Sequence, residues 1–597
     1  MNVTSPISEP FLAAQILEAQ NLMRAEQFSA AVEFLTPVVK AIRFDPAKPA
    51  ELFALLLMAD AQRFKGLPGD AYQNYVIASE LDPKQLSRLQ KHILRCVSEM
   101  QEPIVSPTFE KHLIEYFNNP ALDNTSVDRI SIKLLKQKFQ LEKDDAQLEF
   151  SEIIADPFLP HAISHLILAD PHVEIFLNQL RNQVFTLALE SDLIEELQGI
   201  VIALAEHAER VEYAFSVTDS ERVVLLGIKT LLETEVHNES QLQQHLGPLM
   251  LYAMFESIGN LSFCRELKIS NIQEWPTAIQ PLLKKTLIDR TTEQELGGSI
   301  TQLGAIIRDV SKAVMNQYEQ NPYPRWEHIF ITDKKVRYLE MFPTIKPATR
   351  KAKKFSKSID CLIAGAGTGK QPLWLAANCQ DIKILALDLS LPSLSYAKRQ
   401  AIELKLDQHV EFCQGDILDL EAVDRKFDVI ECSGVLHHME DPEAGLKILL
   451  KRLRSDGLLR IGLYSRIARD KIGVNSARVD NPAATLEDIR TTRADHIDTE
   501  ANLAKTSRDF YTASECRDLL FHVQEHQFDI PQIKSLLDRN DLDFLGFSPL
   551  SPGVDEVFRN RFGPKADFLD LDNWHIFEQE NPYVFKGMYQ FHCQKCG

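Results

Sequence analysis

A glycine-rich turn at the end of an apolar run constrains the fold of this chain more than any other stretch. The run covers 359–364, the turn reads Gly365-Ala366-Gly367-Thr368-Gly369, and an apolar, helix-like segment follows at 372–377. Glycine suits such a turn because the backbone must take positive φ values and approach a ligand that side chains would hold away. A helix that starts there points its free N–H groups back at the ligand. The pattern predicts a nucleotide-binding strand, turn and helix.

Length and charge exclude several classes of protein. A chain of 597 residues predicts about four domains of roughly 150 residues each. The formal net charge of −20 argues against nucleic-acid binding, which needs positive surface. We find no apolar run long enough to span a membrane, no signal-peptide pattern, and no disulfide spacing among the nine cysteines. We therefore expect a cytoplasmic protein without a membrane span.

The first domain, 1–100, resembles tetratricopeptide repeats. Residues 52–83 have a small residue where two helices would cross, a glycine at the turn, two alanines on the second helix and a stop at the end: Ala59, Gly66, Ala71 with Ala78, and Asp82-Pro83. Residues 12–46 form a looser copy, with Ala19, Phe28, Ala31 and Asp45-Pro46. The resemblance implies paired antiparallel helices whose concave face often holds a peptide. An ordinary pair of helical hairpins is the alternative.

A second helical domain and a linking segment follow. In 101–312 apolar residues recur at three- and four-residue steps, with breaks at Pro157, Pro160, Pro171 and Gly297-Gly298. Residues 313–357 then contain the rigid, aromatic sequence NPYPRW, which we interpret as a lid over a cofactor; a hydrophobic plug between domains is the alternative. The basic stretch 347–357 predicts a solvated linker, or else a contact with an acidic partner.

From Ile359 onward, predicted strands and helices alternate. Strands are expected at 359–364, 382–387, 409–413, 427–431 and 457–463, and helices at 370–378, 392–404 and 442–453. This predicts a parallel, doubly wound core over 358–465, with ligands at the carboxyl ends of its strands. A polar helical insertion covers 466–540, and 541–597 adds two late strands at 542–547 and 584–593. The expected fold is a helical N-terminal half followed by a seven-stranded, Rossmann-like α/β domain.

Four motifs together resemble those of a class I S-adenosylmethionine-dependent methyltransferase. They are the glycine turn, Asp388 at the end of the second strand, Gly415-Asp416-Ile417 after the third, and FDVIECSGVLHHMEDP at 427–442. The turn and the acid alone would fit NAD equally. The position of Asp416 and the GVLHHMEDP loop favour S-adenosylmethionine.

The resemblance implies which residues hold this cofactor. Asp388 accepts from the two ribose hydroxyls, and Asp416 accepts from the adenine amino group while Ile417 packs near the ring. The implied set of cofactor-binding residues is Gly365, Ala366, Gly367, Gly369, Asp388, Leu389, Asp416, Ile417, Cys432, Ser433 and Tyr318. Many members also carry an acid two residues before the first glycine, where this chain has Ile363. Backbone carbonyls or a residue of the tyrosine-rich segment must then neutralise the cofactor's ammonium group.

The layout resembles bacterial tetratricopeptide–methyltransferase fusions and, more faintly, bacterial protein-lysine methyltransferases. It implies a protein or peptide substrate, with a lysine nitrogen favoured, held by the helical half. A small-molecule methyltransferase and a binding protein with a degenerate methyltransferase domain are the alternatives.

Methyl transfer needs a positioned, deprotonated nucleophile and no metal. Candidate catalytic residues are His437, His438, Tyr323, Tyr464 and His522. In 507–526, Ser514 predicts an N-cap and places Asp518, His522, Glu525 and His526 on one helical face, either toward the substrate or toward solvent. We expect no zinc site there, although 522–526 spells HxxEH, because no third ligand is identifiable.

Overall fold

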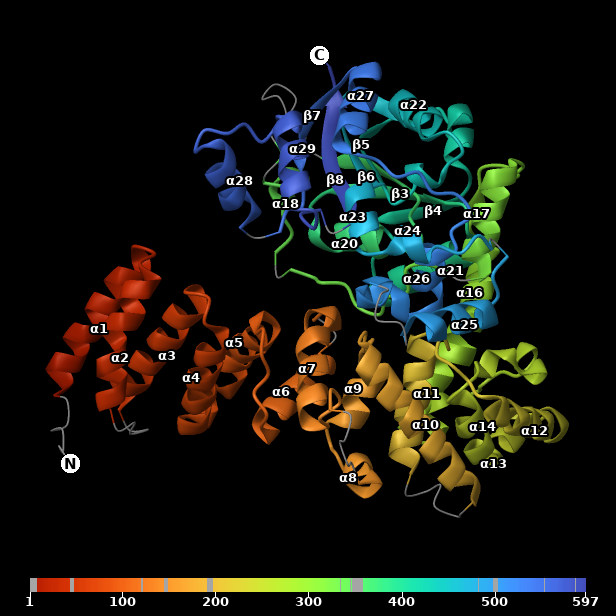
Figure 1. The fold of residues 1–597 in the computed structure, drawn as a ribbon, viewed down its shortest axis with the longest axis horizontal. Helices are drawn as coiled ribbons and strands as arrows, with labels where there is room; N and C mark the ends of the chain where they lie inside the picture. Colours follow the sequence, from red (N-terminus) through yellow and green to blue (C-terminus); the bar gives the residue numbers. More distant parts are fainter. Residues whose placement is uncertain are drawn as a thin grey trace. The chain divides into compact units, whose positions relative to one another are not determined.

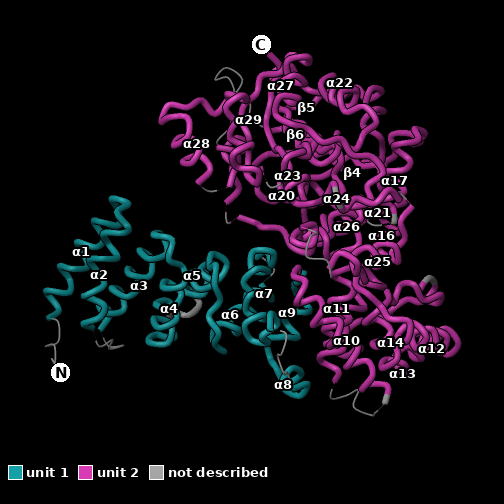
Figure 2. Tube along the Cα trace, viewed as in Figure 1, with its two compact units in different colours: residues 1–168 teal, residues 169–597 magenta. Residues whose placement is uncertain are grey.

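The computed structural model describes residues 8–42, 48–119, 122–143, 149–190, 197–320, 322–332, 334–343, 345, 358–481, 483–497, 503–551, 553–585 and 587–596. The chain divides into two compact units, Met1–Leu168 and Ala169–Gly597 (Figure 2). The predicted stop at Asp45-Pro46 and the basic stretch 347–357 lie outside the described residues. Within the described residues, no helix has the length and apolar character needed to cross a bilayer.

The first unit is a series of helices (Figure 1), in which each helix from α1 to α5 packs on the next and α6 also packs on α9. The three alanines of the predicted repeat, Ala59, Ala71 and Ala78, are fully buried, and Gly66 turns the chain with a φ of +85°. Helical hairpins therefore form where they were predicted, and the tetratricopeptide identity remains a prediction. The helices are α1 (Glu9–Arg24), α2 (Phe28–Ala41), α3 (Pro49–Phe64), α4 (Pro68–Leu81), α5 (Leu86–Glu99), α6 (Pro107–Phe117), α7 (Asp128–Lys138), α8 (Phe150–Ile154) and α9 (Leu159–His165).

The second unit begins with further helices. Pro171 begins α10 and Gly297 ends α16, so these breaks lie where the sequence predicted them. The helices that precede residue 358 in this unit are α10 (Pro171–Glu190), α11 (Gln198–Arg210), α12 (Asp219–Glu235), α13 (Glu239–Gln244), α14 (Leu246–Ala253), α15 (Gln280–Leu283), α16 (Asp289–Gly297), α17 (Asp309–Gln320) and α18 (Tyr338–Met341).

The described residues form one sheet of eight strands in the order β1-β4-β3-β2-β5-β6-β8-β7. Strand β8 is antiparallel to both β6 and β7, and the other neighbouring strands are parallel. The prediction of seven strands missed β1, a two-residue polar strand that pairs with β4. The strands are β1 (Thr301–Gln302), β2 (Ile359–Ala364), β3 (Ile382–Asp388), β4 (Val410–Gln414), β5 (Phe427–Ser433), β6 (Leu453–Tyr464), β7 (Leu542–Phe547) and β8 (Met588–Lys595).

Apolar cores on both faces of the sheet explain its doubly wound form. Leu362 and Ala364 belong to one core, whereas Cys361 and Ile363 belong to the other, because successive residues of a strand point to opposite faces. The helices that pack around the sheet are α20 (Lys370–Asn378), α21 (Leu391–Glu403), α22 (Pro442–Arg452), α27 (Ile530–Arg539), α28 (Val554–Phe562) and α29 (Leu571–Glu580). The three helices predicted between strands are therefore present, with bounds within one residue.

The insertion between β6 and β7 departs from the prediction at its central helix. It contains α23 (Arg466–Lys471), α24 (Val474–Ala477), α25 (Leu486–Ile497) and α26 (Ala513–Leu520). The N-cap of α26 is Thr512, whose hydroxyl accepts from the Glu515 N–H at 3.2 Å, so the N-cap predicted at Ser514 is wrong. Because α26 ends at Leu520, the residues predicted on its face at 522–526 lie beyond the helix.

Candidate active site

The glycine turn has the backbone conformation that its composition predicted. Gly365, Gly367 and Gly369 have φ values of +83°, +52° and +85°, a region that side chains rarely adopt. A Cβ atom at Gly369 would lie 2.5 Å from Cβ of Ala397, and one at Gly367 would lie 2.6 Å from the carbonyl oxygen of Tyr323. The backbone of the turn therefore lies too close to Ala397 and Tyr323 to accommodate side chains at Gly369 and Gly367.

The NPYPRW segment lies directly against this turn. The Thr368 N–H donates to the Tyr323 carbonyl at 3.2 Å, and the Thr368 hydroxyl donates to the Pro324 carbonyl. The buried indole of Trp326 returns a bond, from Nε1 to the Thr368 carbonyl at 3.0 Å. The segment therefore packs directly on the glycine turn, and its role as a lid stays a prediction.

Replacing Gly367 by alanine is expected to weaken both the turn and the lid. A left-handed backbone costs a residue with a Cβ roughly 1–2 kcal/mol, and here the new methyl group also meets the Tyr323 carbonyl. Thermal unfolding should show a lower midpoint, and calorimetric titration should show weaker binding of S-adenosylmethionine. Gly304→Ala is the matched control, since a Cβ there meets no atom within 4 Å; an equal loss in both variants would contradict this account.

Asp388 closes the turn at the end of β3. Its Oδ2 accepts from the Gly367 N–H at 2.7 Å and its Oδ1 from the Ser390 N–H at 2.9 Å. Burial raises the pKa of this carboxyl, and the backbone N–H bonds oppose the rise. A carboxylate has about four acceptor positions, so two oxygens that each accept one N–H can also accept from hydroxyl groups.

Asp416 lies after β4 and contacts a segment that the sequence did not connect with it. Its Oδ1 accepts from the Leu418 N–H at 2.9 Å, while Oδ2 accepts from Arg308 Nη1 at 3.1 Å and from the Ser311 hydroxyl at 2.6 Å. Ile417 beside it is buried. No motif surrounds Arg308 and Ser311, so only the fold reveals that the start of α17 closes this corner.

The other predicted cofactor residues lie at the ends of neighbouring strands. The Leu389 carbonyl accepts from the Gln414 side chain at 3.0 Å, and Cys432 is fully buried in β5. The Ser433 hydroxyl lies 3.6 Å from the sulfur of Met588. Ala366 is buried in the turn. These positions agree with a ligand at the carboxyl edge of the parallel strands.

A buried acid does lie beside Ile363, but it is already paired. Glu431 is the neighbour of Ile363 across the β2–β5 pair and is 0% exposed. Its oxygens accept from Tyr338 at 2.7 Å, from Arg460 at 2.9 Å and from the Gln371 amide. Since three donors already bond to this carboxylate, it is not available to pair with the cofactor's ammonium in place of the acid that is missing at position 363.

A cluster of tyrosines and one carboxylate gathers next to the lid. Asp518 of α26 accepts from the Tyr318 hydroxyl at 2.7 Å and from the Tyr464 hydroxyl at 3.0 Å. The ring of Tyr323 stacks on Tyr318 with centroids 6.2 Å apart. The tyrosines are half-buried, whereas Asp518 is buried. Burial raises the pKa of each tyrosine, with Asp518 the next contributor, so the hydroxyls stay protonated.

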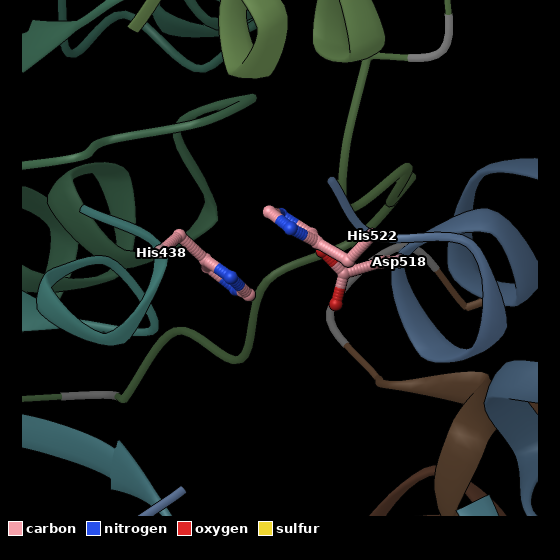
Figure 3. A group of neighbouring side chains, drawn as sticks. All are labelled: His438, Asp518 and His522. Atoms are coloured by element: carbon pink, nitrogen blue, oxygen red, sulfur yellow. The ribbon is translucent and has the colours of Figure 1, made fainter. Parts of the chain in front are cut away.

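His438 and His522 face one another beside Asp518 (Figure 3). Their rings stack at 3.5 Å between centroids. His438 Nδ1 lies 2.8 Å from the Gln524 carbonyl, which only accepts, so Nδ1 carries the proton and Nε2 the lone pair. His522 Nδ1 accepts from the Gln524 N–H at 3.2 Å, which places its proton on Nε2, 3.2 Å from the Tyr318 hydroxyl.

These tautomers bear on metal binding. His438, Asp518 and His522 bring three possible ligand atoms within 4.8 Å of one another. A metal needs the lone pair of each imidazole, but His522 uses its Nδ1 lone pair for the Gln524 N–H and carries a proton on the other nitrogen. In these tautomers the group is arranged for hydrogen bonding. The absence of a metal stays a prediction, and its ground is wrong, because His438 and Asp518 lie beside His522 as further possible ligands.

His437 completes the set of predicted catalytic residues. It is 0% exposed and stacks on Tyr464 with centroids 4.0 Å apart. Neither ring nitrogen has a hydrogen-bond partner among the described residues. Burial lowers the pKa of His437, His438 and His522, so these rings are neutral near pH 7. The structure thus brings all five predicted catalytic residues together, although Asp518, their common neighbour, was predicted only as part of a helical face.

Comparison with known proteins agrees with this geometry. Residues 362–461 match the family described as a methyltransferase domain. This part of the chain is a methyltransferase domain. The sequence motifs predicted S-adenosylmethionine as its cofactor. The residues fit that group, because a cradle of glycines without room for side chains lies next to a carboxylate with acceptor positions for ribose hydroxyls.

Two curated proteins are similar to part of this chain. The chain is 29% identical over 235 residues to an uncharacterized protein of Synechococcus sp. This match covers 36% of this chain and 55% of that protein. It is 33% identical over 105 residues to phosphoethanolamine N-methyltransferase 3 of Arabidopsis thaliana, covering 18% of this chain and 21% of the plant enzyme. The match therefore spans about half or less of each of these relatives.

One solved structure similar to part of this chain is PKMT2 from Rickettsia typhi in complex with AdoHcy. It is 16% identical, with a TM-score of 0.29, over 42% of this chain and 50% of that one.

Proposed function

We propose that this chain is an S-adenosylmethionine-dependent methyltransferase that methylates an amine nitrogen of a protein side chain, with lysine favoured. The observation that supports this most is the group formed by Asp518 with Tyr318 and Tyr464, which lies beside the glycine turn and the lid. One buried carboxylate among aromatic rings suits an alkylammonium group, which rings attract through their faces and an acid attracts by charge.

The charges around this group agree with a cationic acceptor. The three histidines are neutral because burial lowers the pKa of each. The nearest arginine, Arg469, lies over the Tyr464 ring and is paired with the buried Glu525. Asp518 therefore has no cationic side chain bonded to it among the described residues. An incoming ammonium supplies the missing positive charge.

Catalysis at an amine requires that the nitrogen lose a proton before it attacks. When bound, S-adenosylmethionine supplies an electrophilic methyl group. Asp518 orients the amine, and Tyr318 and Tyr464 hold the carboxylate in place. His438 is positioned to take the proton at Nε2, since its Nδ1–H is fixed on the Gln524 carbonyl. The proposed lid contacts the turn through Trp326, and its task in this proposal is to shield the bound cofactor from water.

A protein substrate is proposed from the organisation of the chain. The first unit forms successive helical hairpins, and an array of that kind presents an extended surface to a peptide. The Arabidopsis relative is named as an N-methyltransferase of phosphoethanolamine, which also favours an amine nitrogen as acceptor. A small amine remains the second candidate for the same reason.

Transfer of labelled methyl from S-adenosylmethionine into cell extract tests the proposal. We expect label in protein, located on lysine by mass spectrometry. Label only in material that passes a small-pore filter would instead establish the small-molecule activity. A chain without cofactor binding or transfer would establish the degenerate domain.

A truncated chain that begins at Ala169 tests the role of the first unit. This boundary is chosen because residues 169–597 form one compact unit. If the first unit recognises the substrate, truncation lowers protein labelling and leaves cofactor binding intact. Equal labelling by the truncated and full chains would exclude a recognition role.

A further inference from the structure

A strained turn at the end of α11 contacts two parts of the candidate site, the lid and α26. Glu212 and Tyr213 follow α11 with φ values of +54° and +60°. Two consecutive residues with side chains in the left-handed region are unusual, and each costs of order 1–3 kcal/mol. Such a conformation persists only where surrounding contacts hold it. The contacts of this turn therefore indicate which parts of the molecule it positions.

The Glu212 carboxylate joins the lid to α26. Its Oε1 lies 3.0 Å from Nε of Arg325, two residues after Tyr323 in the lid. Its other oxygen accepts from the Ser514 N–H in the first turn of α26. Ser514 lies one helical turn before Asp518, and a negative charge at the N-terminus of a helix is favourable. A single buried side chain therefore fixes both the lid and the helix that carries Asp518.

The same turn also holds the rest of the insertion. Arg490 of α25 donates from Nε to the Tyr213 carbonyl at 2.8 Å. Arg493, one helical turn later, donates to the Ala214 carbonyl and to the Phe510 carbonyl at 2.6 Å. Arg493 is 1% exposed and is paired with Glu174 of α10 at 2.5 Å. The helices at 169–297 thus make charged and backbone contacts with the insertion.

We propose that Glu212 is a positioning residue for methyl transfer, which sets the distance between the lid on the cofactor side and Asp518 on the acceptor side. The helical region 169–297 is then a working part of the catalytic unit as well as a scaffold. The inference rests on the proposed function, since it assigns Glu212 a task in that reaction. Nothing in the sequence around Glu212 indicates this task, because its partners lie more than a hundred residues away.

The test compares Glu212→Gln with Glu209→Gln in the full chain. Both glutamates pair with Arg325, and Glu209 does so at 3.0 Å from Nη1, but among the described residues only Glu212 also bonds to α26. For Glu212→Gln we expect about tenfold weaker S-adenosylmethionine binding by calorimetry, and roughly a tenfold lower initial rate of methyl transfer into extract protein at saturating cofactor. For Glu209→Gln we expect both values within about twofold of the unsubstituted chain.

A double-mutant cycle with Arg325→Gln separates positioning from folding. If the Glu212–Arg325 ion pair acts as a unit, the double variant Glu212→Gln/Arg325→Gln binds cofactor and transfers methyl no worse than the more impaired single variant. A Glu212→Gln chain that binds cofactor and transfers methyl like the unsubstituted chain would overturn the inference. So would a lower unfolding midpoint with an unchanged rate per folded molecule. If the unsubstituted chain itself fails to bind S-adenosylmethionine, the proposed function fails instead.

Discussion

Asp388→Ala is expected to reduce S-adenosylmethionine binding at least about 100-fold. We propose that the carboxylate at the end of β3 accepts from two ribose hydroxyls, and a hydrogen bond to a charged group contributes roughly 1.5–3 kcal/mol. Loss of two such bonds totals about 3–6 kcal/mol, and 1.4 kcal/mol is a factor of ten in affinity. Calorimetric titration of the full chain with S-adenosylmethionine measures the change directly.

Two controls separate this loss from damage to the turn. Asp388 also accepts from the Gly367 and Ser390 N–H groups, so thermal unfolding of the variant must be recorded alongside binding. Asp407→Ala, at an exposed position, is the matched control for the same change of side chain. Cofactor binding by Asp388→Ala equal to that of the unsubstituted chain would place the cofactor site elsewhere.

The raised pKa of Asp388 leads to a further expectation, about how the stability of the folded chain depends on pH. Burial raises the folded-state pKa of its carboxyl above the ordinary value, so the folded chain holds this proton to a higher pH than the unfolded chain does. Ionisation of Asp388 therefore costs stability as the pH rises through this range. Asp388→Asn removes that ionisation, and we expect the variant to lose cofactor affinity while its unfolding midpoint depends less on pH between the two pKa values.

The methyltransferase core was predictable from the sequence because its signals are local. The apolar run 359–364 is a fully formed strand, and the glycines take the positive φ values that their positions required. Strand β1 was missed since Thr301-Gln302 is too short and polar to show a period. Arg308, Ser311 and Glu212 were missed because each acts on residues far away in the chain, and a single sequence carries no sign of such pairing.

The prediction for the insertion was partly right for a wrong reason. Asp518 and His522 were placed together as neighbours on one helical face, but α26 ends at Leu520 and Phe521 leaves the helix with a φ of −122°. The two side chains still meet, with 3.7 Å between His522 Nε2 and Asp518 Oδ1. Contacts with Tyr318 and with the Gln524 backbone hold His522 there. Helical periodicity predicts neither of these contacts.

Asp518→Asn is expected to lower the rate of methyl transfer roughly 100- to 1,000-fold, with only a small effect on cofactor affinity. An acid that orients an amine contributes on the scale of general acid–base and electrostatic groups, about 10²–10⁴ in rate. The amide introduced by this substitution would keep the volume and one acceptor for Tyr318 or Tyr464, but it would supply no charge for an ammonium. Initial rates of labelled-methyl transfer into extract protein, together with cofactor titration, measure the two effects separately.

The tyrosines that hold Asp518 give a graded version of the same test. Tyr318→Phe and Tyr464→Phe each remove one donor to the carboxylate, and we expect a smaller loss of rate for each than for Asp518→Asn. Asp538→Asn, at an exposed position on α27, is the control for the acid-to-amide change. If Asp518→Asn transfers methyl at the rate of that control, the acceptor does not lie at this carboxylate. If the rate falls while the two phenylalanine variants behave like the unsubstituted chain, Asp518 acts by charge alone and needs no fixed orientation.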